Sequence, residues 1–244
     1  METHEMKISL PLTLLVAPIA ASIFTTTAQA TIVLGNGQVI NLATLMSMED
    51  RRVEIGDKVF DFQSYTSAYF PSSNVSLIGF ISDSTNQYGL HNVGFDLTGG
   101  FGDANPGSGQ VHEANLQYSV AVQDSYYRQG VRLHDAALLF NGDAEGPGSY
   151  ARVDETIIDL DTNTLLGNMF VFNNSMTKLQ DHLDFGTTGY RAFEVNKDLK
   201  FLAATADGIS SCSFVRQEFS QVPTPGALAL LGVSALVGAR RRRA

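Results

Sequence analysis

Alternating apolar and polar residues run through the central part of the chain and predict β-strands. The alternation is clear in Val75–Ser82, Leu116–Val122 and Phe214–Phe219, with the two-residue period of a half-buried strand. Further apolar runs add expected strands at Val59–Phe62, Leu133–Phe140, Ala151–Leu160, Leu165–Phe172 and Ala192–Val195. Because neighbouring side chains of a strand point to opposite faces, such segments bury one face and leave the other open to solvent.

Glycine-rich segments separate these runs and predict turns. They stand at Gly35–Gly37, Gly99–Gly100, Asn105–Gly107, Asn141–Asp143 and Gly146–Gly148. The best candidate for a helix is the short segment Ala43–Arg52. Many short strands between such turns, with no repeat of fixed spacing and no linker, predict an all-β fold: a single antiparallel β-sandwich or jelly-roll-like domain.

The composition agrees with a globular domain that folds without disulfides. Of 244 residues, 44% are hydrophobic and 17% are charged, and there is one cysteine and no tryptophan. A chain of this length buries a sufficient core on its own. We interpret Cys212 as a small buried apolar residue, since it has no second cysteine to pair with and no local motif activates it as a nucleophile.

Residues 1–30 have the layout of a secretory signal peptide. Lys7 provides the positive charge, Ile8–Phe24 is the apolar stretch, and Ala28 and Ala30 give the small-x-small cleavage pattern. The sequence therefore predicts export by the general secretion machinery. The alternative is an N-terminal anchor that is not cleaved.

The C-terminus predicts a short transmembrane helix. Phe219–Ala239 carries no charged residue and is about as long as the ~20 residues that a helix needs to cross a bilayer. A block of four arginines follows this run: Arg240, Arg241, Arg242 and Arg243. The positive-inside rule keeps this block cytoplasmic and leaves the preceding chain outside, which agrees with the signal peptide.

A short motif stands at the entrance to the charge-free run: Val222, Pro223, Thr224, Pro225 and Gly226. Together with the apolar run and the arginine block it resembles a PEP-CTERM protein-sorting signal, a tail that is also labelled an ice-binding protein C-terminal domain. The resemblance implies an exosortase substrate, an exosortase being a membrane cysteine transpeptidase of bacteria that make exopolysaccharide. Thr224 stands where the family usually has glutamate, so this is a Pro-Thr-Pro variant. The alternative is an ordinary C-terminal anchor that no enzyme cuts.

The expected extracellular domain lies between the two ends, at Thr31–Gln221. It holds 11 of the 16 Lys and Arg and 23 of the 25 Asp and Glu, a net charge near −12. Such a surface repels phosphate backbones and excludes nucleic acid as a partner. Four segments of this domain also resemble a recurring extracellular module found ahead of such tails, which implies a β-sandwich without an assigned enzymatic activity: Ile55–Phe60, Leu138–Gly142, Val195–Leu199 and Gln217–Gln221.

One segment matches the opening of a calcium loop, with Asp159, Asp161 and Asn163 at the right spacing. The loop would then need glycine and glutamate where Thr164 and Phe170 stand. We therefore interpret the segment as a hairpin turn. The expectation is no cofactor, with calcium as an alternative that lacks a complete motif.

No catalytic motif is complete in the sequence. The segment Gly99–Gly102 lacks the third glycine of a dinucleotide loop and is interpreted as a turn. Ser108 and Ser149 do not complete a Gly-x-Ser-x-Gly elbow. The histidines of the domain show no metal-ligand spacing and are interpreted as surface or strand-end residues: His91, His112, His134 and His182. We expect no catalytic and no metal site.

Tyr126 and Tyr127 are the candidate glycan contacts, because exposed aromatic rings stack on sugars. If they lie on a strand, at most one of them joins a given platform. The leading hypothesis is a non-enzymatic structural or adhesive protein. It is exported as an inner-membrane-tethered precursor and then retained in the cell envelope, at the outer surface or in the extracellular polysaccharide matrix of a biofilm. The alternatives are a glycan-binding module of the exopolysaccharide matrix and a polysaccharide hydrolase that uses an acidic pair.

Overall fold

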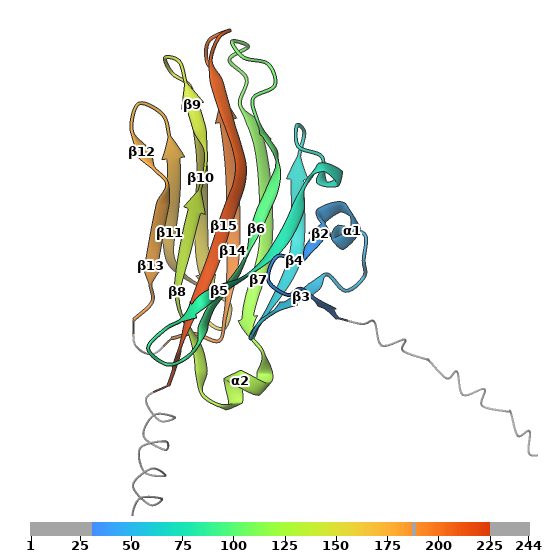
Figure 1. Cartoon of the computed structure of the whole chain (residues 1–244), viewed down its shortest axis with the longest axis vertical. Helices are drawn as coiled ribbons and strands as arrows, with labels where there is room; N and C mark the ends of the chain where they lie inside the picture. The colour runs from blue at the N-terminus through green and yellow to red at the C-terminus, as the bar shows by residue number, and fades with distance from the viewer. Residues whose placement is uncertain (1–30, 187–188, 225–244) are drawn as a thin grey trace, which may run out of the picture. The chain divides into compact units, whose positions relative to one another are not determined.

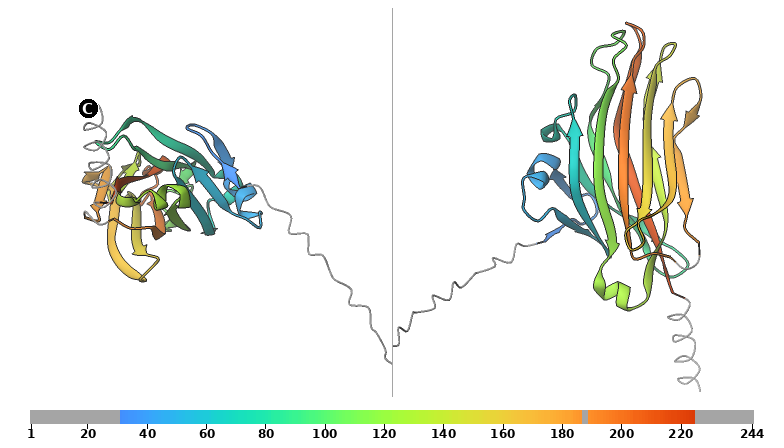
Figure 2. Two further views of the ribbon diagram at one scale, coloured as in Figure 1. Left: turned by 90° about the horizontal axis from the view of Figure 1, so that it is seen from below. Right: turned by 180° about the vertical axis from the view of Figure 1, so that it is seen from behind.

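The computed structural model of the protein describes residues 31–186 and 189–224. The expected signal peptide (residues 1–30), Pro225, Gly226, the rest of the apolar run and Arg240–Arg243 lie outside these described residues. Strands dominate the described part and form two sheets that pack face to face (Figures 1 and 2). The predicted antiparallel β-sandwich is therefore confirmed.

The first sheet, called sheet A, has eight strands in the spatial order β1, β3, β4, β7, β14, β10, β11, β12. Their bounds, in that order, are Ile32–Val33, Arg52–Ile55, Lys58–Ser67, His112–Val122, Ala192–Leu202, Tyr150–Asp159, Thr164–Asn173 and Thr177–Lys178. All neighbours in this sheet are antiparallel except β1 and β3, which are parallel.

The second sheet, called sheet B, has seven strands: β13, β8, β15, β6, β5 and β2 in spatial order, with β9 paired to β15. Their bounds are Gln180–Asp184, Val131–Phe140, Ile209–Pro223, His91–Gly102, Ser76–Thr85 and Val39–Asn41, and Asp143–Glu145 for β9. Three short helical segments connect strands: α1 (Leu42–Met46), the 3-10 turn η1 (Ser72–Asn74) and α2 (Asp124–Arg128). No helix between residues 31 and 224, as far as that stretch is described, is long and apolar enough to cross a bilayer.

Aromatic rings from both sheets fill the centre of the core. Phe60 of sheet A meets Phe95 of sheet B edge-to-face, with ring centroids 5.4 Å apart, and lies 6.1 Å from Phe219. Phe62 and Tyr118 pack beside them, and all five side chains are almost fully buried. Burial of each such ring contributes about 1.5–3 kcal/mol, so phenylalanine supplies the bulk that tryptophan gives in other sandwiches.

The predicted helix Ala43–Arg52 is wrong in extent. Helix α1 covers only Leu42–Met46, and Arg52 already begins strand β3. The side chain of Asn41 caps the helix by accepting from the backbone N–H groups of Ala43 and Thr44. Only Leu42 and Leu45 of this helix are buried. Their packing against the core therefore stabilises a single helical turn.

The predicted turn at Gly99–Gly102 is also wrong, because strand β6 continues through Gly102. The glycines serve close approach between backbones instead of a reversal of the chain. A Cβ atom added to Gly102 would lie 2.7 Å from the carbonyl oxygen of Ser210 on the neighbouring strand β15. Glycine inside a strand is typical of such an approach.

The last strand reaches into the expected sorting motif. Strand β15 runs past the expected domain end at Gln221 to Pro223, and Val222 and Pro223 pair with Arg132 and Val131 of β8. Phe219, where the charge-free run begins, is fully buried in the core. The start of that run therefore belongs to the sandwich, and only its part beyond Thr224 is left for a membrane-spanning segment.

The packing of β6 against β15 yields a stability prediction. The change Gly94→Ala would place a Cβ 1.7 Å from the carbonyl oxygen of Gln217. Because that oxygen belongs to the backbone of a central strand, we expect the free energy of unfolding to fall by about 3 kcal/mol or more. Urea unfolding of the purified protein measures this change in the free energy of unfolding.

The matched control is Gly100→Ala in the same strand, where an added Cβ meets no atom within 4 Å. It should change the free energy of unfolding by less than about 0.5 kcal/mol. Equal stability of the two variants would contradict the close approach of β6 and β15.

Candidate functional site

The outward face of sheet A carries rows of polar side chains that cross five neighbouring strands. Figure 2 (right) shows this sheet from its outer side. One row consists of directly paired residues of β4, β7, β14, β10 and β11, with four polar residues and an apolar one at its end: Thr66, Asn115, Asp198, Asp154 and Phe170. The next row comes from the same strands: Ser64, Gln117, Asn196, Thr156 and Asn168. Four interstrand gaps make each row about 19 Å long.

Four cavities that share lining residues lie along these rows and at their end, and together they are called the sheet A groove. The largest, about 510 Å³, is lined by Tyr150, Arg152, Asp154, Phe172, Asn174, Met176 and Lys200. It shares Asp154 with a cavity of about 290 Å³ over β7, β10 and β14, which shares Asn115 with one of about 420 Å³ at Thr66–Tyr69. A fourth, of about 350 Å³ at the loop Gly146–Ser149, shares Tyr150 and Asn174 with the first.

Hydrogen bonds between side chains hold the polar rows in place. The amide nitrogens of Gln117 and Asn196 both donate to Oε1 of Glu194, over 2.9 and 3.1 Å. The hydroxyl of Thr156 donates to Oδ1 of Asn168 over 2.9 Å. These side chains are therefore preorganised on the sheet, which lowers the entropy that ordering them would cost on binding.

Two ion pairs lie in the middle of the groove. Arg152 binds both carboxylate oxygens of Asp154, and Lys200 contacts Asp198 and lies 3.8 Å from Asp154. The hydrogen bond to Asp154 raises the pKa of Arg152, and the one to Asp198 raises the pKa of Lys200. Both cations thus have their charge balanced within the groove.

An apolar strip borders the groove along strand β11. Phe170 and Phe172 lie on the same face of the strand with ring centroids 6.1 Å apart and ring planes within 15°. Phe170 is 39% exposed and Met176 is 69% exposed. The ammonium group of Lys178 lies 3.9 Å from the centre of the Phe170 ring, and it also pairs with Asp181.

A buried ion pair lies directly beneath the floor of the groove. Glu155 of β10 and Lys197 of β14 are cross-strand partners whose side chains point into the core, where both are fully buried. The ammonium group of Lys197 donates to Glu155 and, over 2.8 Å, to Oε1 of Gln217 in sheet B. Burial raises the pKa of Glu155 and lowers that of Lys197, and the opposite charge of the partner counters both shifts.

The sequence-predicted glycan contacts Tyr126 and Tyr127 lie elsewhere, on helix α2 at the end of the sandwich. They line none of the four groove cavities. The guanidinium of Arg132 lies 3.6 Å from the centre of the Tyr127 ring and that of Arg191 lies 5.0 Å from it. Tyr127 is therefore covered by cations, while Tyr126 is 37% exposed.

The hairpin predicted around Asp159, Asp161 and Asn163 is confirmed. It joins β10 to β11, and Asn163 has the positive φ of 54° that suits a tight turn. Asp159 accepts from the backbone N–H of Asp161 and from the hydroxyl of Thr162. Its carboxylate is thus engaged in holding the turn.

Cys212 is buried, as predicted. Burial raises the pKa of its thiol to about 12. Ser149 is also buried and accepts from the backbone N–H of Ala204, whereas Ser108 accepts from Gln110 N–H in an exposed loop. Each of these side chains has a structural role that its contacts account for.

The histidines are spread over the sandwich. His112, predicted to be a surface or strand-end residue, begins β7 but is buried; it stacks on Tyr69 with 3.9 Å between ring centroids and lies 3.6 Å from Asp103. His91 begins β6 and contacts Ser82 O. His134 lies on β8, where its Nδ1 is 2.8 Å from Gly186 O. Nowhere in the described ranges do three or more metal-ligating side chains converge.

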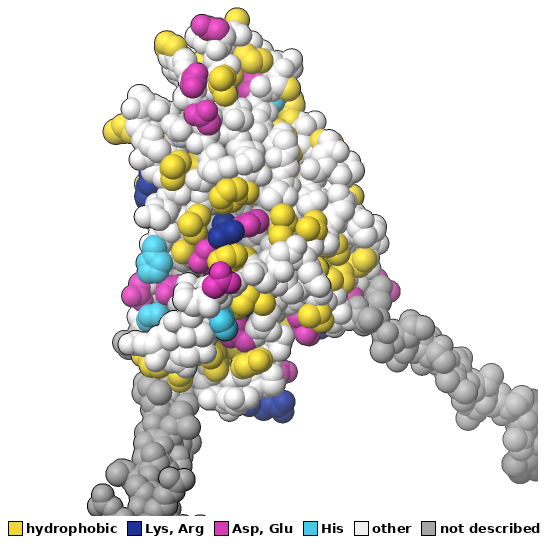
Figure 3. Space-filling view, in the orientation of Figure 1, with side chains coloured by type: hydrophobic (Ala, Val, Ile, Leu, Met, Phe, Trp, Pro, Cys, Tyr) yellow, Lys and Arg dark blue, Asp and Glu magenta, His cyan; other side chains and the backbone are white. Residues whose placement is uncertain are grey.

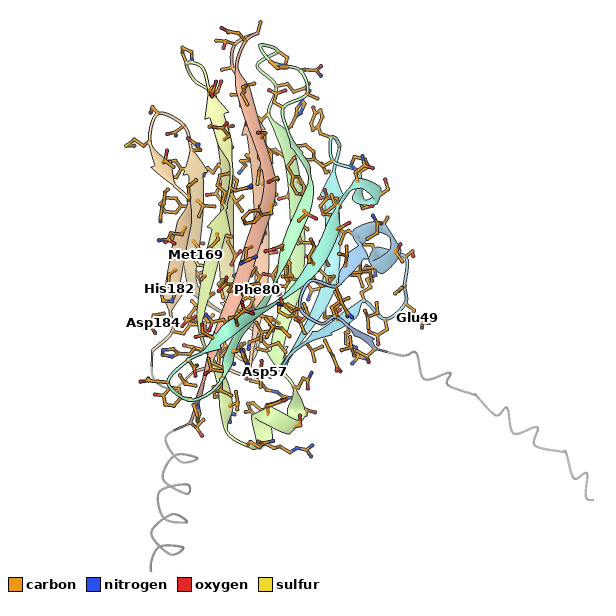
Figure 4. All side chains as sticks on the ribbon, viewed as in Figure 1. Glu49, Asp57, Phe80, Met169, His182 and Asp184 are labelled. Atoms are coloured by element: carbon orange, nitrogen blue, oxygen red, sulfur yellow. The ribbon has the colours of Figure 1, made fainter. Side chains whose placement is uncertain are left out.

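A serine, an aspartate and a histidine do meet on the outer face of sheet B (Figure 4 labels His182). The hydroxyl of Ser220 donates to Oδ2 of Asp135, and Nε2 of His182 lies 3.6 Å from that same oxygen. A nucleophilic serine needs the histidine as its direct base. Here the carboxylate stands between them, so the order of contacts is not that of a catalytic triad.

Apolar side chains gather around a basic one on the same face of sheet B (Figure 3). The guanidinium of Arg216 lies 4.0 Å from the centre of the Phe80 ring and 5.9 Å from that of Phe214. It also binds both oxygens of Asp96. The charge of Arg216 is thus balanced within sheet B, and the sheet A groove is the stronger candidate site.

The groove residues were not among the sequence-predicted candidates, although a signal existed. The outward positions of the expected strands Leu116–Val122 and Ala151–Leu160 carry Gln117, Asp154 and Thr156. Amides and hydroxyls at consecutive outward positions of several strands indicate a polar surface with more specific use than solubility. Which strands lie side by side was not visible from the sequence, and without that order the rows cannot be assembled.

Comparisons with known proteins find similarity among solved structures. No protein-family model matches the sequence, and no curated protein matches it. TmCBM61 in complex with β-1,4-galactotriose is 6% identical, with a TM-score of 0.31 over 63% of this chain and 86% of that chain. TmCBM27, a carbohydrate-binding module with specific mannan recognition, is 10% identical, with a TM-score of 0.27 over 74% and 95%. Similarities this low carry no argument about what this chain binds.

The buried pair yields a prediction about stability. The change Lys197→Met leaves the carboxylate of Glu155 in the core without its cation. We expect the free energy of unfolding to fall by about 3–5 kcal/mol. The double variant Lys197→Met, Glu155→Met removes both charges and should recover most of that loss, as measured by urea unfolding.

The control is Lys200→Met, three positions along the same strand but on the outward face, where its ammonium group is partly exposed. Such a surface pair contributes less than about 1 kcal/mol. A loss in Lys197→Met no larger than that in Lys200→Met would contradict the role given to the buried pair.

Proposed function

We propose that the protein binds polysaccharide in the sheet A groove and serves as a non-catalytic, adhesive component of an extracellular matrix. The observation that carries the proposal is the set of cavities that share lining residues across sheet A, with ordered amides, hydroxyls and carboxylates beside an apolar aromatic strip. Sugars present hydroxyl groups at their edges and C–H groups on their faces. The polar rows match the edges, and Phe172, which lines the largest of the four cavities, matches the faces.

The dimensions of the groove support a chain-like ligand. Rows of about 19 Å, estimated from the strand spacing, exceed the size of a single sugar. The side chains that line it project from strands and are tied to one another by hydrogen bonds. Sites on rigid strands keep their geometry better than sites on loops.

A binding role is favoured over a hydrolase. Hydrolysis needs one carboxylic acid that donates a proton and a second carboxylate on the other side of the scissile bond. The two neighbouring aspartates of the groove, Asp154 and Asp198, are each occupied by a cation, Arg152 and Lys200. Neither carboxyl group is free to act as the proton donor while these pairs hold.

The delivery of the protein is a second part of the proposal. Residues 1–30 direct export, and the tail that begins at Val222 is read as a sorting signal by an exosortase. The support is the order of the motif, the charge-free run and Arg240–Arg243 in the sequence. A matrix polysaccharide outside the cell is then the ligand that a protein with this address meets.

The glycan-binding proposal predicts that Phe172→Ala weakens binding, since Phe172 lines the largest of the four cavities. Loss of one stacked ring weakens the binding free energy by about 1 kcal/mol, which is roughly a fivefold rise in Kd. The measurement is isothermal titration of the full chain, purified in a mild detergent, with the exopolysaccharide of the producing organism.

Tyr126→Ala is the control, since Tyr126 is an exposed aromatic residue on helix α2 and lines none of the four cavities. We expect Tyr126→Ala to leave Kd unchanged. A loss confined to Tyr126→Ala would place the ligand at helix α2, and no saturable binding by the unaltered protein would refute the proposal.

The sorting proposal predicts that deletion of Arg240–Arg243 leaves the precursor unprocessed. The arginines hold the tail in the membrane with its end in the cytoplasm, so the motif at Val222–Gly226 is not presented to the exosortase without them. Immunoblots of the producing organism distinguish precursor from product by size. Equal processing of the full chain and of the truncated chain would refute this part of the proposal.

A further inference from the structure

We propose that the sheet A groove selects uncharged polysaccharides, because every basic side chain that lines it is already paired with a carboxylate of this chain. The inference rests on the proposed function and adds the chemical class of the ligand. It follows from how charges are arranged in the described part of the groove.

Three basic residues line the groove: Arg152, Lys197 and Lys200. Lys197 turns into the core to Glu155 and is fully buried. Arg152 lies 2.8 and 2.9 Å from the two oxygens of Asp154 through its Nε. Lys200 contacts Asp198 and has Asp154 at 3.8 Å. None of the three presents an unpaired charge to a ligand.

The acidic side chains exceed the solvent-facing basic ones. Asp154, Asp198 and Glu113 line the cavities, against Arg152 and Lys200. Burial raises the pKa of Tyr150 and the hydrogen bond to Asp198 raises that of Lys200, and the negative charge of Glu113 adds to both shifts. A uronate or a sulfated sugar would therefore meet excess negative charge along most of the groove.

The hydrogen-bonding groups of the groove also favour an uncharged ligand. A sugar hydroxyl both donates and accepts, so it donates to a carboxylate or to Asn115 while accepting from an amide nitrogen. A sugar carboxylate only accepts, and to pair with Arg152 or Lys200 it competes with Asp154 or Asp198, which already hold these cations. Displacement leaves a carboxylate of the protein unpaired inside the groove, which opposes binding.

The first experiment compares polymers of different charge with the full chain in mild detergent at 0.15 M salt. The neutral probes are mannan, galactan and mixed-linkage glucan; the acidic probes are polygalacturonate and alginate; the cationic probe is chitosan. We expect saturable binding to at least one neutral polymer, with at least tenfold weaker binding to the acidic and cationic ones. Tighter binding to an acidic or cationic polymer overturns the inference but leaves the proposed function standing, whereas binding to no polymer overturns both.

The second experiment releases a cation. Asp154→Asn removes the carboxylate that holds Arg152, and we expect binding to polygalacturonate to tighten at least fivefold at low salt and to weaken again as salt is added. Asp50→Asn is the matched control, since it breaks the bidentate pair with Arg52, which lines no cavity of the groove, and changes the net charge by the same amount. Equal gains in both variants would trace the effect to overall charge and overturn the inference.

Discussion

The buried ion pair of Lys197 and Glu155 is the constraint on which the rest of the structure depends. The two residues are cross-strand partners in sheet A, and Lys197 also donates to Gln217 of sheet B, so three strands and both sheets meet at one charge. A buried pair of this kind adds little net stability, but an unpaired charge in the core is costly. A shift of β14 by one residue would turn Lys197 outward and leave Glu155 alone. The pair therefore penalises every register except the observed one.

The same register places the groove. Glu155 lies between Asp154 and Thr156, and Lys197 lies between Asn196 and Asp198, so the inward pair and the outward rows are set by one alignment of β10 with β14. The pairing of β10 with β14 therefore fixes both which side chains enter the core and which line the groove. If this alignment failed, the polar rows would face the phenylalanines of the core and the apolar side chains would face solvent.

A second buried cluster secures the end of the folded chain. Lys58 donates to Asp57 over 2.8 Å and to Gln221, and the Nε2 of Gln221 donates to the carbonyl of His91. Burial lowers the pKa of Lys58, and the carboxylate of Asp57 opposes that shift. Gln221 lies just ahead of Val222 and Pro223, which remain paired with β8. The sandwich is therefore closed around β15 through Val222 and Pro223, the first two residues of the expected sorting motif.

The sequence by itself determined the class of fold, because the two-residue period of apolar side chains is a local property of each strand. It also determined the hairpin at Asp159–Asn163, whose cause lies within a few residues. Tertiary structure decided the role of the β6 glycines. The sequence predicted a turn there, but the glycines allow the backbones of β6 and β15 to approach closely. It alone decided the groove and the buried pairs, since Asp154 and Asp198 are far apart in the chain and become neighbours through strand order. Local patterns fix which face of a strand is apolar; only the order of the strands fixes which polar side chains share the other face.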